Sequence, residues 1–141
     1  MTVSPSRPTV SLVIFAALAA GAIVGIGLDR VVLARQDGIK RTILMKTDDP
    51  AGPGYEAVMG LAELAPGASI GKHHHYGIEL AYVLEGSVVV ERDGQPNATF
   101  KTGDALKNVG GHDARNPGSA PARLLAVYIV EKGKPLSEPV K

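Results

Sequence analysis

From residue 35 onward, short runs of Val, Ile, Leu and Tyr alternate with polar positions and are separated by Gly and Pro. Runs with a period of two are typical of β-strands, and many of them in succession indicate an all-β sandwich or barrel. No stretch in this part of the chain keeps a helical period. The pattern therefore predicts strands over residues 39–46, 55–64, 73–75, 78–84, 87–92, 95–101 and 123–130.

Turn-forming residues lie between these expected strands, as in Ala65-Pro66-Gly67. Asp93-Gly94 stands between two apolar runs, which favours a tight hairpin with a type I′ turn. We expect one β-barrel domain over residues 35–132. A Pro-containing C-terminal arm over residues 133–141 should follow it, either extended or partly frayed.

The first part of the chain has a different pattern. Between Val10 and Leu28 there is no charged residue and Ser11 is the only polar one, so this segment should form a hydrophobic helix. Arg7 precedes it, and Val32-Leu33-Ala34 offers a small residue where a signal peptidase could cut. A cleaved signal peptide and an uncleaved membrane anchor both fit residues 1–34, and either one predicts a periplasmic or otherwise extracytoplasmic domain.

Charge and cysteine content limit the partners and the metal ligands that can be expected. The chain has 15 Lys and Arg against 14 Asp and Glu, and these charges are scattered. A nucleic-acid partner is not expected, because such a partner favours clustered basic residues with aromatic residues between them. The chain has no cysteine, so it forms no disulfide, and any bound metal must be held by nitrogen and oxygen atoms.

The four histidines fall in two places, His73-His74-His75 and His112. Because residues two apart on a strand point to the same face, His73 and His75 should point inward and His74 away. Glu79 keeps the same parity if the strand continues. Two imidazoles and a carboxylate make a metal site that leaves coordination positions open. His112 must come from another strand, as a fourth ligand brought in by barrel closure.

The spacing of these residues resembles the cupin family. Its first motif is G, five residues, HxH, three or four residues, E, six residues, G, and it is matched by Gly67, His73, His75, Glu79 and Gly86. The second motif is matched at its start by Gly103 and at its end by His112 and Asn116. Between them, Val109-Gly110-Gly111 replaces the Pro-containing turn, and the spacing to His112 is two residues shorter.

The resemblance implies a double-stranded β-helix, the jelly-roll barrel of the cupins, with a metal in the barrel mouth held by His73, His75, Glu79 and His112. The metal would be one divalent ion among Fe, Mn, Zn, Ni and Cu. The resemblance also implies a small-molecule ligand or substrate and a homodimer. Two functions remain open: a metal-dependent, dioxygenase-like oxidoreductase of the cell envelope, or a non-catalytic module that binds or senses a ligand.

No catalytic residue is assigned by these patterns. Tyr82 and Tyr128 can approach the cavity, although the strand parity of Tyr82 favours the outer face. Arg92 and Lys107 can meet an anionic substrate at the rim, or be ordinary solvated charges. Asp104 can fix a turn as readily as it can take part in chemistry.

Overall fold

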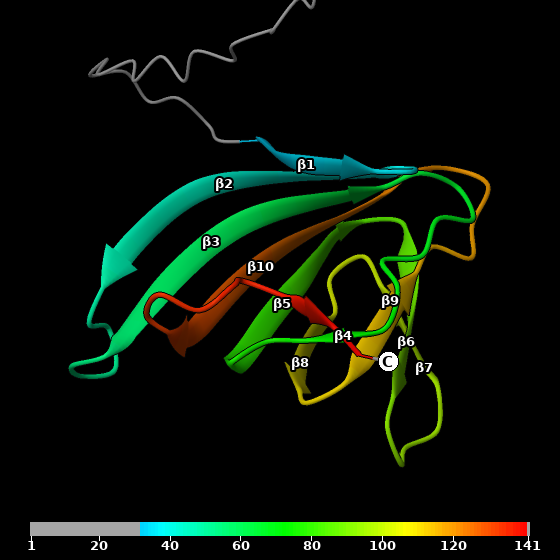
Figure 1. Ribbon diagram of the computed structural model, residues 1–141. Coiled ribbons are helices and arrows are strands. Elements are labelled where there is room, and N and C mark those ends of the chain that lie inside the picture. Colours follow the sequence, from blue (N-terminus) through cyan, green and yellow to red (C-terminus); the bar gives the residue numbers. More distant parts are fainter. Residues whose placement is uncertain (1–31, 141) are drawn as a thin grey trace, which may run out of the picture.

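The computed structural model describes residues 32–140, which form two antiparallel β-sheets (Figure 1). One sheet has the order β1-β2-β3-β10-β5-β8, and the other has the order β11-β4-β9-β6-β7. The strands are β1 (Val32–Gln36), β2 (Ile39–Asp48), β3 (Tyr55–Leu64), β4 (His73–His74), β5 (Gly77–Glu85), β6 (Ser87–Arg92), β7 (Ala98–Lys101), β8 (Ala105–Val109), β9 (His112–Arg115), β10 (Ala122–Glu131) and β11 (Glu138–Pro139).

Side-chain alternation determines which residues form the core. Along β10 every second residue from Ala122 to Val130 is buried, because this strand lies between β3 and β5 with one face toward the other sheet. Complete burial of a side chain such as Leu64 stabilises the fold by about 1.5–3 kcal/mol. The buried apolar residues are Ile39, Val58, Ala62, Leu64, Ala81, Val83, Val88, Val90, Leu106, Ala114, Ala122, Leu124, Ala126, Tyr128 and Val130.

This architecture is the all-β double-stranded β-helix that the sequence pattern and motifs predict. Besides β1 and β11, near the two ends of the described residues, the pattern did not predict β8 or β9. Both strands carry polar side chains at inward positions, Asn108 on β8 and His112 on β9, and both side chains are buried. Inward polar residues remove the apolar alternation on which strand prediction depends.

The turn after β6 differs from the prediction. Gly94 has a φ of 70°, but Asp93 does not have a positive φ, whereas a type I′ turn requires one at both central residues. The type I′ prediction is therefore wrong. The hairpin is also wider than expected, since β7 begins at Ala98. Pro96 has no backbone N–H with which to continue the ladder.

The hydrophobic helix predicted near the N-terminus lies outside the described residues. Between residues 32 and 140, the structure contains no helix of the length and apolar character needed to span a membrane.

The C-terminal arm is extended and attached to the barrel rather than frayed. Its strand β11 pairs with β4, and the Val140 N–H donates to the Lys72 carbonyl at 3.0 Å. Leu136 packs against the core, and the Tyr76 hydroxyl donates to the Glu138 carboxylate. The arm thereby brings residues from the end of the described chain beside the first histidine cluster.

Candidate metal centre

The paired strands β4 and β9 bring the inward histidines together. His73 is on β4 and lies directly opposite His112 of β9 in the antiparallel register, while His75 follows the end of β4. All three side chains are buried, whereas His74 is only half-buried and lies on the other face. Each of the three buried imidazoles offers one nitrogen, and these three atoms lie within 4.8 Å of one another.

Glu79 joins this cluster from a separate strand. The expected unbroken strand through residues 73–79 is not formed, because β4 ends at His74 and β5 begins at Gly77. A Cβ at Gly77 would lie 2.1 Å from the Ile129 carbonyl oxygen, so only glycine permits β5 to start this close to β10. Along β5, Glu79 then takes an inward position in line with Ala81 and Val83.

Backbone carbonyls orient all three imidazoles in the same way. His73 Nδ1 lies 2.7 Å from the Gly71 carbonyl, His75 Nδ1 2.5 Å from the Leu136 carbonyl, and His112 Nδ1 3.0 Å from the Gly110 carbonyl. A carbonyl only accepts hydrogen bonds, so each Nδ1 carries a proton, and the Nε2 of each neutral imidazole keeps a free lone pair. Where His112 Nε2 donates to the Glu79 carboxylate, that ring carries a proton on both nitrogens, and a metal ion would displace the Nε2 proton. Metal-binding histidines in proteins commonly show this arrangement.

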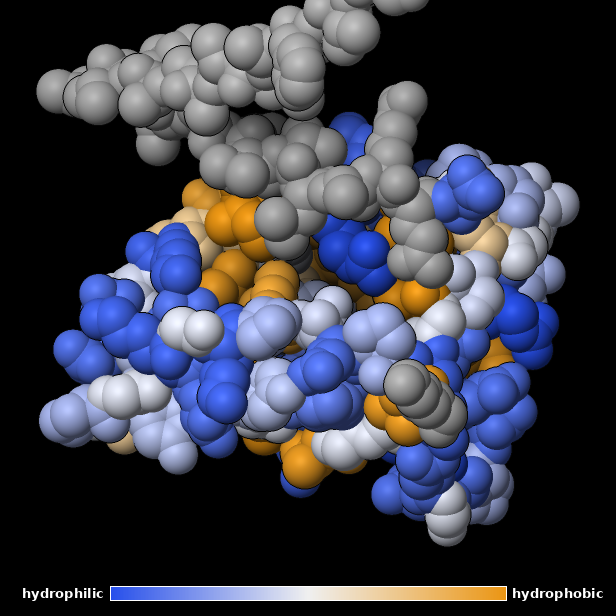
Figure 2. All heavy atoms as spheres, viewed as in Figure 1, coloured by the Kyte–Doolittle hydropathy of each residue, from blue (hydrophilic) through white to orange (hydrophobic). Residues whose placement is uncertain are grey.

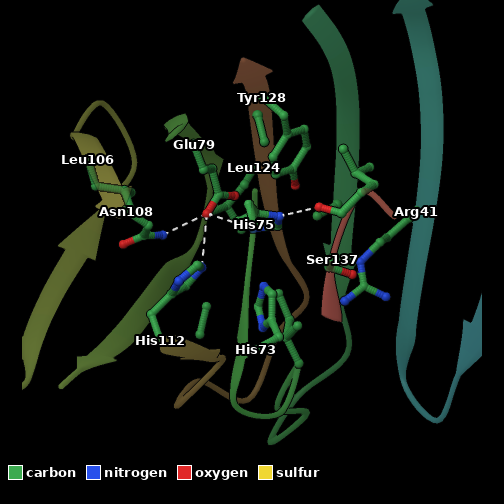
Figure 3. Close-up of a pocket in the computed structure, with 15 residues that line it drawn as sticks. Arg41, His73, His75, Glu79, Leu106, Asn108, His112, Leu124, Tyr128 and Ser137 are labelled. Atoms are coloured by element: carbon green, nitrogen blue, oxygen red, sulfur yellow. Dashed lines mark hydrogen bonds and ion pairs between the residues drawn. The ribbon is translucent and has the colours of Figure 1, made fainter. Parts of the chain in front are cut away.

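The Nε2 atoms face the interior and Glu79 (Figure 3). His112 Nε2 lies 3.1 Å from Glu79 Oε2, within hydrogen-bond distance. His75 Nε2 lies 3.7 Å from the same oxygen, too far for a hydrogen bond, and it is buried with no hydrogen-bond partner among the described residues. A buried nitrogen lone pair without a partner is costly in an apoprotein but suits a metal ligand. The donor set of imidazole nitrogens with one carboxylate oxygen fits a divalent transition metal.

Burial and hydrogen bonding shift the pKa values of the titratable groups in the cluster. Burial lowers the pKa of His73 to about 4, so this imidazole is neutral at pH 7. Burial alone would raise the pKa of Glu79, but hydrogen bonding with His112 and Asn108 and the proximity of His75 hold it well below its usual range. Burial likewise opposes protonation of His112, yet the hydrogen bonds with Glu79 and Gly110 raise its pKa overall.

The cluster forms one side of a cavity of about 270 Å³. Most of the remaining wall is apolar, with Arg41, Asn108, Tyr128 and Ser137 as further polar residues. The lining residues are Arg41, Ala62, Ile70, His73, His75, Glu79, Leu106, Asn108, His112, Ala114, Leu124, Ala126, Tyr128, Leu136 and Ser137.

The sequence family agrees with the geometry. A family model described as a cupin domain matches residues 60–128, which contain all four proposed ligands. The chain is a cupin-domain protein. Cupins often bind metals, and the three histidines of this cupin could hold one.

Among sequence relatives, this cupin is similar to the tetracenomycin polyketide synthase protein TcmJ of Streptomyces glaucescens. The two are 34% identical, over 64% of this chain and 60% of that protein. The chain therefore matches less than two thirds of the length of its curated relative.

Three solved structures illustrate the shared fold. The polyketide cyclase RemF from Streptomyces resistomycificus has a TM-score of 0.61 at 21% identity, covering 85% of this chain and 87% of that one. An uncharacterized conserved protein with a double-stranded β-helix domain from Klebsiella pneumoniae has a TM-score of 0.61 at 20% identity, over 78% and 90%. A predicted oxalate decarboxylase from Thermotoga maritima has a TM-score of 0.57 at 24% identity, over 74% and 93%.

The shortened second motif of this cupin still delivers His112 to the cluster. Gly110 has a φ of 77°, which lets the chain turn sharply between β8 and β9. Asn116, the last residue of that motif, is buried away from the cavity and bonds only backbone groups. Its Nδ2 donates to the carbonyls of Leu64, Ala65 and Ala120, and its Oδ1 accepts from the Gly118 N–H.

Asn108 is a site residue that the sequence patterns missed. Its Nδ2 donates to Glu79 Oε2 at 2.7 Å, and its Oδ1 accepts from Arg92 Nε at 2.9 Å. Arg92 is thus neither at the cavity rim nor an ordinary solvated charge, since it also lies over the Phe100 ring, 5.4 Å from the centroid. A lone Asn in a short strand carries no pattern that marks it as a site residue.

The structure shows which of the other candidate residues line the cavity and which do not. Tyr128 lines the cavity, and burial raises the pKa of its phenol far above the usual value, so it stays protonated. Tyr82 is 45% exposed and does not line the cavity. Lys107 is exposed on the other face of β8, so it does not meet a substrate there. Asp104 fixes a turn, because its Oδ2 accepts from the Lys101 N–H at 2.7 Å.

Proposed function

We propose that this cupin binds one divalent metal ion through His73, His75, His112 and Glu79, and uses it to hold a small molecule in the cavity. One observation carries the proposal. Three backbone carbonyls fix the three imidazoles with their Nε2 atoms converging, and the buried His75 Nε2 has no other partner among the described residues. This arrangement costs stability unless a cation occupies it.

The four residues have distinct parts in the proposed site. The histidines supply neutral lone pairs, and Glu79 supplies a carboxylate that Asn108 holds in position. A bound divalent ion would supply Lewis acidity and open positions for a ligand. Fe, Mn, Zn, Ni and Cu all accept this donor set.

The test of the metal site is elemental analysis of protein purified without a histidine tag. We expect close to one metal per chain. The variant His112→Ala should then bind the same ion more weakly, while His74→Ala serves as the matched control, since His74 is on the opposite face. Metal content that is equally high in His112→Ala would mean that only His73, His75 and Glu79 hold the metal.

An enzymatic and a non-enzymatic form of this function lead to different results. The enzymatic form is a dioxygenase-like reaction at the open coordination positions. The Tyr128 phenol, held protonated, can donate a hydrogen bond to a ligand but does not serve as a base at neutral pH. The cavity therefore offers no uncommitted base, and this favours the second form, a module that binds or senses its ligand without turnover.

Oxygen uptake distinguishes these two forms. Protein containing Fe(II), Mn(II), Ni(II) or Cu(II) is mixed with small phenols, thiols and dicarbonyl compounds. The oxygenase form requires oxygen consumption that Glu79→Ala abolishes. Saturable ligand binding without consumption in every metal form supports the binding module.

Two of the four similar proteins, TcmJ and RemF, have names that concern polyketides, but the cavity favours smaller molecules. Pockets for drug-sized ligands enclose about 300–1,000 Å³. The cavity of this cupin, about 270 Å³, is close to the lower limit of that range. We propose that the substrate or ligand is smaller than a drug-sized compound, whether or not it is chemically related to polyketides.

We also propose an extracytoplasmic location, for which the support is the uncharged segment from Val10 to Leu28. The full chain can be fused to a reporter that is active only in the cytoplasm. We expect no reporter activity, whereas strong activity would reject export.

A homodimer through the outer face of β5 and β8 completes the proposal. Leu80, Tyr82, Leu84 and Val109 are large hydrophobic side chains that are exposed on these strands. In the described sheet β8 is an edge strand, which can pair with another chain. Analytical ultracentrifugation should give a dimer for wild type and a monomer for Leu80→Glu with Val109→Lys.

A further inference from the structure

Arg41 is a cationic side chain that points into the same cavity from the side opposite the histidine cluster. It lies on β2, opposite Ala62 of β3, and both residues line the cavity. In Figure 3 its guanidinium extends from β2 toward the interior and lies next to Ser137 of the C-terminal arm. Its side chain is half-buried.

The guanidinium has no protein partner in residues 32–140. Other basic residues near the barrel have partners: Arg92 donates to Asn108, and Arg123 lies 4.0 Å from Glu63. No hydrogen bond or ion pair of this kind is formed by the Arg41 side chain within that range. Partly buried charges in proteins are normally paired, so an unpaired one facing a cavity indicates an anionic ligand.

Glu79, the other charged side chain that lines the cavity, is already engaged. It accepts hydrogen bonds from Asn108 and His112 on the side of β8 and β9. Arg41 is therefore available to a ligand. Figure 2 shows hydrophobic residues in patches in the upper half of the described surface, with hydrophilic residues between them, whereas hydrophilic residues predominate in the lower half.

We propose that Arg41 binds the carboxylate of a small ligand whose remaining part lies against the apolar wall and reaches the histidine cluster. The planar guanidinium can donate two parallel hydrogen bonds to a carboxylate. Leu106, Leu124 and Ala126 provide apolar wall for the rest of such a molecule. The ligand is then a compact monocarboxylate with an apolar body, which fits about 270 Å³. This inference rests on the proposed function, because it names the ligand class of the same cavity.

Calorimetric titration tests the carboxylate directly. Zinc-loaded protein is titrated with acetate, pyruvate and benzoate, and with the neutral amide of each acid. At least one acid should bind, and its amide should bind about 10-fold more weakly or worse. Arg41→Met should weaken binding of that acid by about 10- to 100-fold, and Arg41→Lys by less.

Lys107→Met is the matched control, because it removes one positive charge from the exposed face of β8 without touching the cavity. It should change acid binding by less than about twofold. Circular dichroism verifies that each variant is folded. The inference is overturned if the amides bind as tightly as the acids, if Arg41→Met binds the acid like wild type, or if no acid binds.

Metal-free protein separates this inference from the proposed metal site. The same titration without zinc should still show weaker acid binding in Arg41→Met than in wild type. A wild-type protein that takes up no metal but keeps this dependence on Arg41 would contradict the proposed metal function and support the carboxylate site. A protein that takes up metal but binds the acid independently of Arg41 would support the proposed metal function and contradict the carboxylate site.

Discussion

Two groups of buried polar side chains in this barrel differ in how their hydrogen-bonding capacity is used. Asn116 is 1% exposed, and both its amide nitrogen and its carbonyl oxygen have backbone partners from neighbouring loops. The histidine cluster is also buried and also fixed by backbone carbonyls, but only through Nδ1. The Nε2 of His75 has no hydrogen-bond partner among the described residues.

The difference separates a structural polar residue from a ligand site. A buried polar group that is fully bonded stabilises one conformation, whereas a buried group with a free lone pair costs stability until something binds it. Both kinds come from motif residues, and burial alone does not distinguish them. The following predictions test whether the two groups affect fold and binding separately.

The largest effect should come from the double variant His73→Ala, His75→Ala. Removing two of the proposed ligands should reduce the metal content from about one ion per chain to background. Inductively coupled plasma mass spectrometry measures it, with the exposed-face variant His74→Ala as control. Wild-type metal content in the folded double variant would refute the site.

Asn116→Ala should have the next largest effect, on stability rather than on metal. The change leaves the buried carbonyls of Leu64 and Ala120 without their donor, which should lower the free energy of unfolding by about 2–4 kcal/mol. Denaturant unfolding measures this, with the exposed Asn97→Ala as control. The metal stoichiometry of the folded fraction should stay at the wild-type value. A selective loss of metal would mean that Asn116 also contributes to the metal site.

Asn108→Leu should produce a smaller change, located at the metal. Without the 2.7 Å hydrogen bond to Glu79, the carboxylate loses a group that positions it, and metal affinity should fall about 10- to 100-fold. Competition with a chelating dye measures the affinity. Lys107→Leu changes the adjacent outward position of the same strand and should leave the metal affinity unchanged. Equal affinity in both variants would mean that Asn108 does not position the ligand.

The smallest effect is a pH dependence of the metal-free protein. The pKa of His73 is lowered to about 4, so the unfolded chain takes up this proton first, and stability should fall as pH drops from about 6.5 to 4. The lowered pKa of Glu79 removes further stability below about pH 4.5, whereas the raised pKa of His112 changes stability only above about pH 6.5 and leaves this acid range unaffected.

Thermal unfolding across this pH range provides the measurement. His73→Gln should flatten the dependence, and Asn116→Ala should keep the wild-type slope at lower overall stability. A wild-type slope in His73→Gln would contradict the assignment to this imidazole.

The sequence predicted the barrel because its core strands alternate regularly. β3 and β10 bury every second residue over their whole length, and the period of two identifies them without further information. The first motif likewise brought His73, His75 and Glu79 together by spacing alone. It did so although the strand is broken between β4 and β5, because Glu79 regains an inward position on the second strand.

The rest of the cavity depends on contacts between distant parts of the chain. Asn108, Arg41 and Ser137 belong to no motif, and each reaches the cavity because a strand or arm folds back beside the histidines. The carbonyl that orients His75 comes from Leu136, 61 residues later in the chain. Side-chain patterns do not encode which backbone carbonyl will meet an imidazole, so spacing could not reveal these partners.

The position of that carbonyl also determines when the site can form during synthesis. Every other residue that faces the cluster precedes Leu136 in the chain except Ser137, and a ribosome or a translocation channel releases the chain from its N-terminal side. A partly emerged barrel can already pair β10 with β3 and β5, but His75 then lacks the Leu136 carbonyl that orients its ring. If the site binds metal as proposed, acquisition in the final geometry would follow the docking of the arm on β4.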